Sequence, residues 1–596
     1  MDTTQSSHLQ TRSLSAGFPS SGNRPASPVL GPTAPWPATG TLSPQRADGL
    51  SPTSSRIASF ALMTLIVILA LALRVSVAQS FAGMVDGEGS EYLTLAKNLL
   101  AGHGYVGIST PGVNLFFPPL FPMAIAGLGA LVDDVDLAGR MLSIALGAAL
   151  TIPVYFIAQE LYGRTVAVMA ASLVAVHPFL VSLATTVQVE SAYALGILTG
   201  MVLLLRAFRV RTVLSFAVAG LVFGLSFLVR GEALVFMLLA LALLACQCLA
   251  VKAMPAGKLA RRAGVLLLAF GLVAAPYVVW LSQQVGQFKL EGKSPLNITV
   301  QRAKQAGIGE YGGAFLIGPD LEEQGAYNVP SVETVRSFSM TPSQLADYLV
   351  SNTSELMGNT LRTITTSGSL GYPLLLPLVL LGLVASAWSS RTLPVQLTLL
   401  GLVGMSIFAT YFIYFTSLRF FVPLLLCMCI WAAAGLWRIR EWAGETADAV
   451  GLSPRLSWVA SGLTLALAAS ALLAPPLVQA ANALVYTRDT RQFVEQAQAL
   501  QAPAGQELRI AAATAVPSYH AHAQHVWLPY TESEATALRY LEKKGANFVI
   551  VRGEDGPRAP YLARWVARGI IDRRAQLVSK FDVGHDEVRI YRLDWN

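Results

Sequence analysis

The sequence predicts an all-α polytopic membrane protein that carries a small α/β domain at its C-terminal end. Hydrophobic residues make up 54% of the 596 residues and charged residues only 13%, whereas soluble domains carry about 25% charged residues. The mean hydropathy is +0.53. Long apolar runs separated by short basic segments account for these values, so we expect the chain to cross a membrane many times.

The apolar runs set the expected number of membrane spans. A helix needs about 20 apolar residues to cross roughly 30 Å of hydrocarbon, and about eleven runs meet this requirement. They lie at 57–77, 138–158, 165–184, 190–207, 212–229, 233–251, 263–283, 371–389, 394–416, 420–437 and 457–480. The run 118–132 is short and opens with two prolines, so it predicts a re-entrant or interfacial helix.

The first 55 residues differ in composition from the rest of the chain. They are rich in Ser, Pro, Thr and Gly and contain few large apolar side chains. Such a segment buries too little apolar surface to offset the entropy lost on ordering. We therefore expect residues 1–55 to be disordered.

Basic residues predict the orientation in the membrane. Arg and Lys gather in alternate short segments, such as 206–211, 252–262 and 438–440, and these segments are cytoplasmic by the positive-inside rule. The N-terminus is then cytoplasmic and, with an odd number of spans, the C-terminus is extracytoplasmic. Residues 56–480 form the transmembrane domain, in what we expect to be the plasma (inner) membrane. The segments 78–137, 284–370 and 481–596 lie outside.

The last of these segments predicts a folded α/β domain. FVIV at 548–551 and EVRIYRL at 587–593 have the alternation of strands, and ATALRYLEKKGA at 535–546 is typical of a helix that ends near Gly545.

Several classes of site find little support in the sequence. The net charge of +7 arises in the short loops rather than in a basic stripe interleaved with aromatics, which argues against nucleic acid. All cysteines lie in apolar runs, without the spacing of a zinc site or a disulfide framework. His520, His522 and His525, in YHAHAQH, are read as part of a polar loop. No cofactor is evident, although a divalent metal is not excluded.

An acidic segment follows the first span. VDGEGSEY at 85–92 holds Asp86, Glu88 and Glu91, and the following residues predict an amphipathic helix that lies along the interface and ends at Gly102. The plainest interpretation of these acids is a solvated loop. Their expected position on the outer face allows a second one, a site at the membrane surface.

Further charges fall at the outer ends of spans. Glu190, Arg230, Glu232 and Arg419 occupy such positions. A charge costs about 3 kcal/mol at the centre of a span and less at the interface, so simple pairing, such as Arg230 with Glu190, explains any one of them. Together they predict a site for an anionic lipid head group, in which arginine binds phosphate and a carboxylate deprotonates a hydroxyl.

The order of these segments resembles a known group of enzymes. VDGEGSEYLTLAKNLLAGHGYVGI, then FPPLFP, then LVRGEALVF and RFFVPLLLCMCIWAAAGL, are similar to landmarks of GT-C glycosyltransferases. The resemblance is to the bacterial branch similar to protein mannosyltransferases and lipid A aminoarabinose transferases. It covers roughly residues 57–250 well and 395–440 less closely.

This resemblance implies an inverting transferase that takes a sugar from a polyprenyl-phosphate-linked donor to an acceptor on the outer face. The catalytic acid is Asp86 or Glu88, which the sequence does not separate. The implied phosphate-binding residues are Arg230, Arg419, His103 and Tyr105, with Glu91, Glu190 and Glu232 in supporting positions. Aminoarabinose transferases have a lysine before the Pro-Pro pair, where this chain has Phe117, so that activity is not expected.

Two other classes of function stay open. A secondary transporter or flippase for lipid-linked sugars would need charges near the membrane midplane and interrupted helices. A non-catalytic scaffold would bind a partner through residues 481–596. The sequence leaves open the sugar and whether the acceptor is a lipid, a glycan or a protein.

Overall fold

A computed structural model describes most of the chain: residues 52–80, 85–249, 255–366, 375–386, 388–389, 392–410, 417–503, 505–583 and 586–595. Residues 1–51, the greater part of the segment expected to be disordered, lie outside this description. Helix α1 (Pro52–Ser80) already includes the last four residues of that segment.

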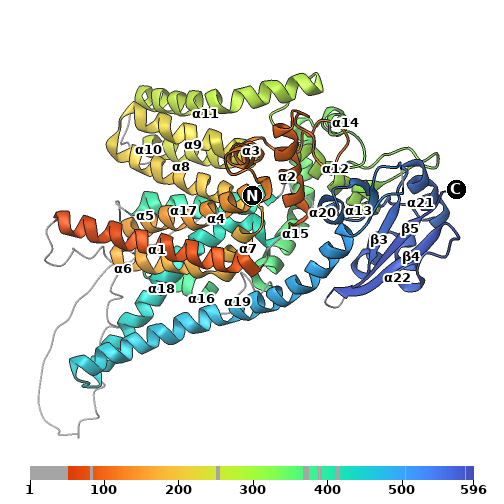
Figure 1. Cartoon of the computed structure of the whole chain (residues 1–596). Coiled ribbons are helices and arrows are strands. Elements are labelled where there is room, and N and C mark those ends of the chain that lie inside the picture. The colour runs from red at the N-terminus through yellow and green to blue at the C-terminus, as the bar shows by residue number, and fades with distance from the viewer. Residues whose placement is uncertain are drawn as a thin grey trace, which may run out of the picture. The chain divides into compact units, whose positions relative to one another are not determined.

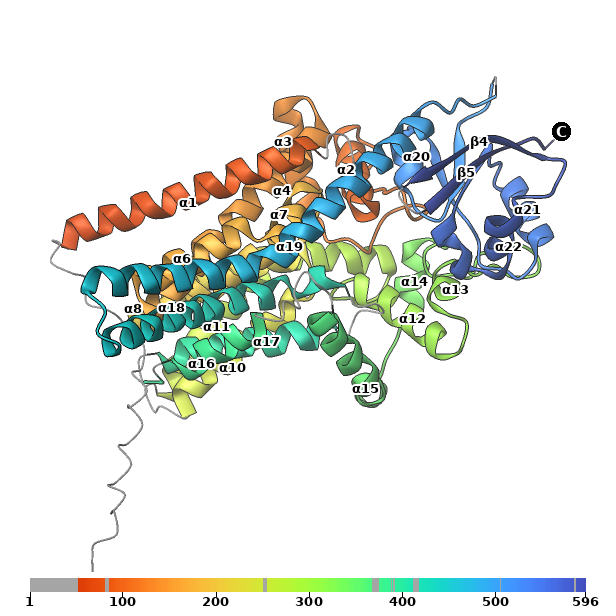
Figure 2. The same cartoon turned by 90° about the horizontal axis from the view of Figure 1, so that it is seen from below.

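Long helices dominate the fold and run side by side in Figures 1 and 2. After α1 come α4 (Val135–Ala149), α5 (Thr151–Tyr162), α6 (Arg164–Val176), α7 (Pro178–Thr185), α8 (Glu190–Val210), α9 (Val213–Val229), α10 (Ala233–Leu249) and α11 (Ala256–Val285). The later members are α16 (Leu375–Val384), α17 (Leu393–Ala409), α18 (Val422–Ala449) and α19 (Pro454–Gln498). The described core is continuous through these helices.

Among the described residues, five helical segments are long and apolar enough to cross a membrane, or six if one bent pair counts as a single span. They are Ile57–Gln79, Val135–Tyr162, Glu190–Val210, Ala256–Val285 and Leu418–Ala449, with the bent pair Arg164–Val176 and Pro178–Thr185. Shorter apolar helices include α9, α10, α16 and α17. The protein is therefore a multi-pass membrane protein, and the number of about eleven spans stays a prediction.

The bend of 50° in the pair α6 and α7 has a local cause and a polar partner. Pro178 follows His177 and cannot donate a backbone hydrogen bond, so α6 ends and its last carbonyls lose their helical donors. The buried guanidinium of Arg74 in α1 donates to the carbonyls of Ala175 and Val174 at 3.0 and 3.4 Å. A charge inside the bundle is thereby satisfied by the broken helix.

Shorter elements lie at one end of the long helices (Figures 1 and 2). Helices α2 (Gly87–Leu100) and α3 (Leu120–Val132) belong to the segment after α1. The loop after α11 holds α12 (Lys293–Gln305), α13 (Glu310–Phe315), α14 (Ser331–Ser337) and α15 (Pro342–Thr366). The run 118–132, expected to be a re-entrant or interfacial helix, forms α3, which packs against α2 and α4.

The C-terminal domain is a five-stranded mixed sheet in the order β2-β1-β3-β5-β4. Its strands are β1 (Arg509–Ala512), β2 (Gln524–Trp527), β3 (Phe548–Arg552), β4 (Ala575–Val583) and β5 (Asp586–Leu593). Its helices are α20 (Val516–His520), α21 (Glu534–Lys543), the 3-10 turn η3 (Gly553–Arg558) and α22 (Pro560–Arg568). Strands β1, β2 and β3 are parallel, and β5 is antiparallel to both β3 and β4.

The fold class predicted from the sequence is confirmed. The strands expected at 548–551 and 587–593 are β3 and β5, and the helix expected at 535–546 is α21. The domain boundary expected at residue 480 falls inside α19, which continues to Gln498 and contacts α20 and β4. One helix therefore joins the long-helix region directly to the sheet domain.

Candidate active site

The acidic segment 85–92 opens helix α2, which explains its glycines. Asp86 is the N-cap, and its Oδ1 atom accepts a hydrogen bond from the backbone N–H of Gly89 at 2.6 Å. A side chain at residue 89 would place its Cβ 2.7 Å from that Oδ1 and 3.1 Å from the carbonyl oxygen of Val187. Glycine is thus required where α2 packs against the segment before α8.

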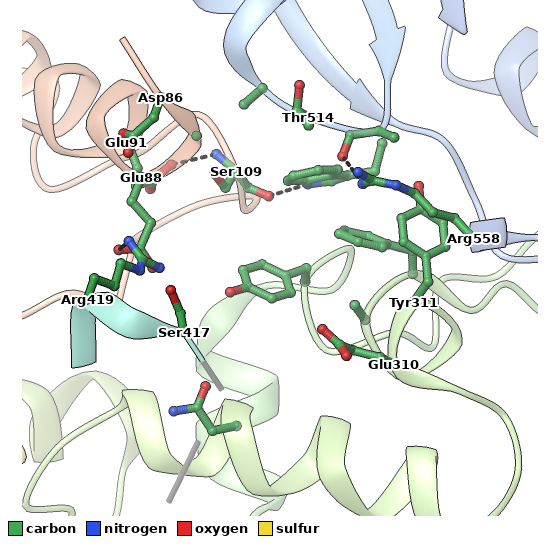
Figure 3. Close-up of a pocket in the computed structure, with 18 of the residues that line it drawn as sticks. Asp86, Glu88, Glu91, Ser109, Glu310, Tyr311, Ser417, Arg419, Thr514 and Arg558 are labelled. Carbon is green, nitrogen blue, oxygen red and sulfur yellow. Dashed lines mark hydrogen bonds and ion pairs between the residues drawn. The ribbon is translucent and has the colours of Figure 1, made fainter. Parts of the chain in front are cut away.

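Asp86, Glu88 and Glu91 all line one pocket of about 1070 Å³ (Figure 3). At this end of the pocket lie α2, the end of α7 and the turn before α18. The pocket continues to α13 and to the sheet domain, where Figure 3 shows Tyr311, Thr514 and Arg558 on the side opposite the acids. Drug-sized ligands fit in about 300–1,000 Å³, so this cavity has room for more than one small group.

Glu88 holds two cations at the acidic end. Its Oε2 accepts a hydrogen bond from Nη1 of Arg419 at 2.9 Å, and its Oε1 lies 3.9 Å from Nζ of Lys293. Arg419 belongs to the 3-10 turn η2 (Leu418–Phe421) and also donates to the side chain of Gln188 at 3.0 Å. Both Glu88 oxygens are therefore engaged, whereas Oδ2 of Asp86 accepts no hydrogen bond from the described residues.

Lys293 is a member of this site that the sequence did not reveal. It is the first residue of α12, where the carboxylate of Glu291 accepts hydrogen bonds from the backbone N–H groups of Lys293 and Ser294. Its Nζ lies 4.1 Å from the centre of the Phe117 ring. The residue before the Pro-Pro pair is thus not basic, but a lysine from a distant loop covers it. In the sequence, the one sign of a structured position at Lys293 was the Gly-Lys-Ser-Pro pattern, which is typical of the start of a helix.

The pKa values of the two candidate acids differ strongly. Burial raises the pKa of Asp86 to about 7, against the hydrogen bond from Gly89 and the charge of Arg419, while the negative charge of Glu88 raises it further. Burial also acts on Glu88, but the charges of Arg419, Lys293 and Arg230 lower its pKa to about 2. Near neutral pH, Glu88 is a fixed anion and Asp86 can gain or lose a proton.

Arg230 lies outside the large pocket. Its guanidinium donates to Glu190 at 3.2 Å and to Glu232 at 3.0 Å, and its side chain is only 14% exposed. It lines a small enclosed space of about 10 Å³ together with Arg419. Glu190 also lies 3.6 Å from Arg419, so the two arginines share one buried carboxylate. The pairing of Arg230 with Glu190 considered from the sequence is present.

Glu91 organises the loop that follows α2. Its carboxylate is 1% exposed and accepts hydrogen bonds from the backbone N–H groups of Ile108 and Ser109, at 3.0 and 2.8 Å, and from the side-chain amide of Asn114. A Cβ at Gly107 would overlap with this carboxylate. Glu91 therefore anchors one wall of the pocket.

Two residues implied by the resemblance lie elsewhere. His103 is exposed just beyond the end of α2 and does not line the described pocket. The hydroxyl of Tyr105 donates to the carbonyl of Phe117 at 2.9 Å, and its ring packs on Trp280. Tyr105 therefore supports the loop on the side away from the pocket. Neither His103 nor Tyr105 faces the acids, contrary to the role that the resemblance implied. No group of three His, Cys, Asp or Glu side chains with metal-binding geometry occurs in the described part of the chain.

Comparisons with known proteins agree with this architecture. Residues 117–280 match the family model described as dolichyl-phosphate-mannose-protein mannosyltransferase. No curated protein matches the sequence significantly.

Solved structures give the fold. An oligosaccharyltransferase, AglB, from Archaeoglobus fulgidus, in complex with an inhibitory peptide and a dolichol-phosphate, is similar at a TM-score of 0.55 and 13% identity. The match covers 91% of this chain and 75% of that one. The apo form of the oligosaccharyltransferase from the same organism is similar at a TM-score of 0.54 and 15% identity, over 90% and 74% of the two chains. ArnT from Cupriavidus metallidurans bound to undecaprenyl phosphate has a TM-score of 0.46 and 10% identity, over 91% and 98%.

The resemblance inferred from the sequence is thereby confirmed at the level of the fold. The chain shares its fold, the GT-C fold, with the oligosaccharyltransferase structures, and its residues 117–280 match the mannosyltransferase family model.

Proposed function

We propose that this protein transfers a sugar from a polyprenyl-phosphate-linked donor to an acceptor hydroxyl, with inversion at the anomeric carbon. The observation that carries the proposal is one pocket lined by Asp86, a carboxyl with a pKa of about 7, and by the two cations that Glu88 holds, Arg419 and Lys293. The similarity to an oligosaccharyltransferase solved with a dolichol-phosphate supports a lipid-phosphate donor.

Asp86 is the general base in this mechanism. Its Oδ1 is fixed by the N-cap hydrogen bond, and its unpaired Oδ2 takes the proton from the acceptor hydroxyl as the new glycosidic bond forms. Proton transfer to a base of matched pKa contributes about 10²–10⁴-fold to the rate. A single displacement from the face opposite the leaving phosphate gives inversion.

The two cations stabilise the leaving phosphate. As the bond between the anomeric carbon and the phosphate oxygen breaks, its electron pair stays on the phosphate, which leaves as an anion. Arg419 and Lys293 face the pocket and supply the positive charge. Glu88 keeps both cations in place, and Arg230 acts behind it through the shared Glu190. We place this site on the outer face of the plasma membrane, which the basic loops support.

The test is sugar transfer in membranes that contain the full chain, with a panel of radiolabelled polyprenyl-phosphate sugars. Wild type is compared with Asp86→Asn and Arg419→Gln, and with Glu333→Gln, an exposed carboxylate in α14, as the matched control. The proposal predicts transfer that the first two changes reduce at least about a hundredfold and the control leaves unchanged. Movement of labelled donor across the bilayer without a product would favour a flippase and refute the proposal.

A further inference from the structure

The end of the pocket remote from the acids is walled by aromatic rings. Tyr311, Phe315, Tyr327, Trp527 and Tyr530 all line it, and we name these five the aromatic arm. The ring centres of Phe315 and Trp527 are 4.4 Å apart, and those of Phe315 and Tyr327 are 5.7 Å apart and nearly parallel. The mechanism above uses none of these rings.

Two separate parts of the chain build the aromatic arm. Tyr311, Phe315 and Tyr327 come from the loop after α11. Trp527 is the last residue of strand β2, and Tyr530 lies in the segment that follows it. Their backbones are joined, because the N–H of Tyr530 donates to the carbonyl of Phe315 at 2.8 Å. The hydroxyl of Tyr311 donates to the carbonyl of Leu528 at 2.8 Å. These bonds hold the rings in place before any ligand arrives.

The indole of Trp527 also links the arm to the acidic end. Its N–H donates to the carbonyl of Ser109 at 2.6 Å, and the N–H of Ser109 donates to Glu91. Figure 3 shows Ser109 between the acids and Tyr311. A ligand group on the arm therefore lies in the same cavity as the proposed base.

The two ends of the pocket differ in chemistry. Near Asp86, part of the lining comes from α7, one half of the bent apolar pair, through Phe179 and Leu183. The aromatic arm is built only from the loop after α11 and the sheet domain, and Glu310, Thr514 and Arg558 add polar groups beside it (Figure 3). A ligand group at the arm therefore meets aromatic rings with polar side chains beside them.

Sugar rings have this surface. They carry C–H groups on their faces, which pack on aromatic rings, and hydroxyls at their edges, which bond to polar neighbours. A peptide adding as a strand would need unpaired backbone groups, but the N–H of Tyr530 and its carbonyl are already bonded to Phe315 and Ile317.

We propose that the aromatic arm binds a sugar residue of the acceptor, so that the acceptor is a glycan chain that the enzyme extends. This inference rests on the proposed function, because it names the acceptor of that reaction. The arm positions the acceptor ring, and a hydroxyl of that ring or its neighbour reaches Asp86.

Binding and turnover are measured separately on the detergent-solubilised full chain. Binding is measured with fluorescently labelled linear hexasaccharides of glucose, mannose and arabinose. An equally labelled hexapeptide and a short-chain phospholipid are the competing ligand classes. Tyr530→Leu removes a ring whose hydroxyl bonds to no described residue, and Tyr530→Phe is the matched control that keeps the ring. Thr514→Met is a second variant, which narrows the arm without deleting a ring.

The proposal predicts that at least one hexasaccharide binds the wild type and that Tyr530→Leu weakens its binding about three- to tenfold. Tyr530→Phe retains binding and Thr514→Met weakens it, whereas Glu333→Gln, the exposed control in α14, leaves both binding and transfer unchanged. If only the peptide or the phospholipid binds, or if no hexasaccharide binds, the proposal that the acceptor is a glycan is wrong. Continued turnover of the donor would then leave the proposed function intact. If the wild type binds a hexasaccharide but consumes none of the labelled donors, the proposed function is refuted instead.

Discussion

Asp86→Asn offers the sharpest test of the site because the structure predicts both the size of its effect and its pH dependence. The amide keeps the N-cap acceptor for Gly89, so helix α2 is retained. It cannot take a proton, and the loss of a general base lowers the rate about 10²–10⁴-fold, which is roughly 2.7–5.4 kcal/mol in the barrier.

The wild-type pH profile follows from the raised pKa. A base has to be deprotonated to act, so transfer rises with pH through the Asp86 pKa of about 7. The rate at pH 6 is then roughly a tenth of that at pH 8. Glu88, with a pKa of about 2, adds no step in this range. Because the Glu88 charge raises the pKa of Asp86, Glu88→Gln moves the rising limb to lower pH.

The assay is initial-rate transfer from saturating labelled donor, from about pH 5.5 to pH 8.5, so that the rising limb is bracketed. Both variants are compared with wild type at matched expression. The assignment fails if Asp86→Asn retains activity within a few-fold or keeps the rising limb. If Glu88→Gln removes the limb and Asp86→Asn does not, the roles of the two acids are reversed.

Three further changes probe the surroundings of the site. Lys293→Ala raises the donor KM at least about tenfold because a phosphate contact is lost. Lys258→Ala, an exposed control in α11, leaves the donor KM unchanged. Equal donor KM values for the two variants would remove Lys293 from the site. Glu91→Gln replaces one acceptor oxygen with an NH2 donor, which then faces either the backbone N–H groups of Ile108 and Ser109 or the side-chain amide of Asn114. Thermal unfolding of the solubilised protein therefore shows a loss of about 1–3 kcal/mol, and an unchanged melting temperature would contradict the anchoring role. Gly107→Ala forces a Cβ into the Glu91 carboxylate and lowers the melting temperature. Gly127→Ala, in α3, where a Cβ meets open space, raises the free energy of unfolding by about 0.5–1 kcal/mol. The opposite order of stability would refute the packing argument.

The sequence predicted the local parts of this site well. Hydropathy located the helices, because a helix in hydrocarbon has to satisfy its backbone within about 20 apolar residues. The amphipathic residues after the acidic segment predicted α2, and the resemblance pointed to Asp86 and Glu88, which do line the pocket. That Asp86 is the N-cap of this helix was seen only in the structure. The charges at helix ends predicted Arg419, which meets Glu88 across 331 residues.

Tertiary packing decided the rest. Periodicity reports which face of a helix is buried but not which distant segment covers it. The sequence therefore could not place Lys293 beside Glu88, nor the ring of Trp527 in the same pocket. The same limit left His103 and Tyr105 as weaker phosphate-binding candidates beside Arg230 and Arg419, although neither lines the pocket. Packing also separated the two candidate acids: burial raises the pKa of Asp86 despite its N-cap hydrogen bond, while Arg419 and Lys293 hold Glu88 ionised. The sequence by itself determined a membrane-embedded helical fold with an acidic helix start, because those depend on local composition. Which carboxyl can exchange a proton was decided by charges that only folding brings together.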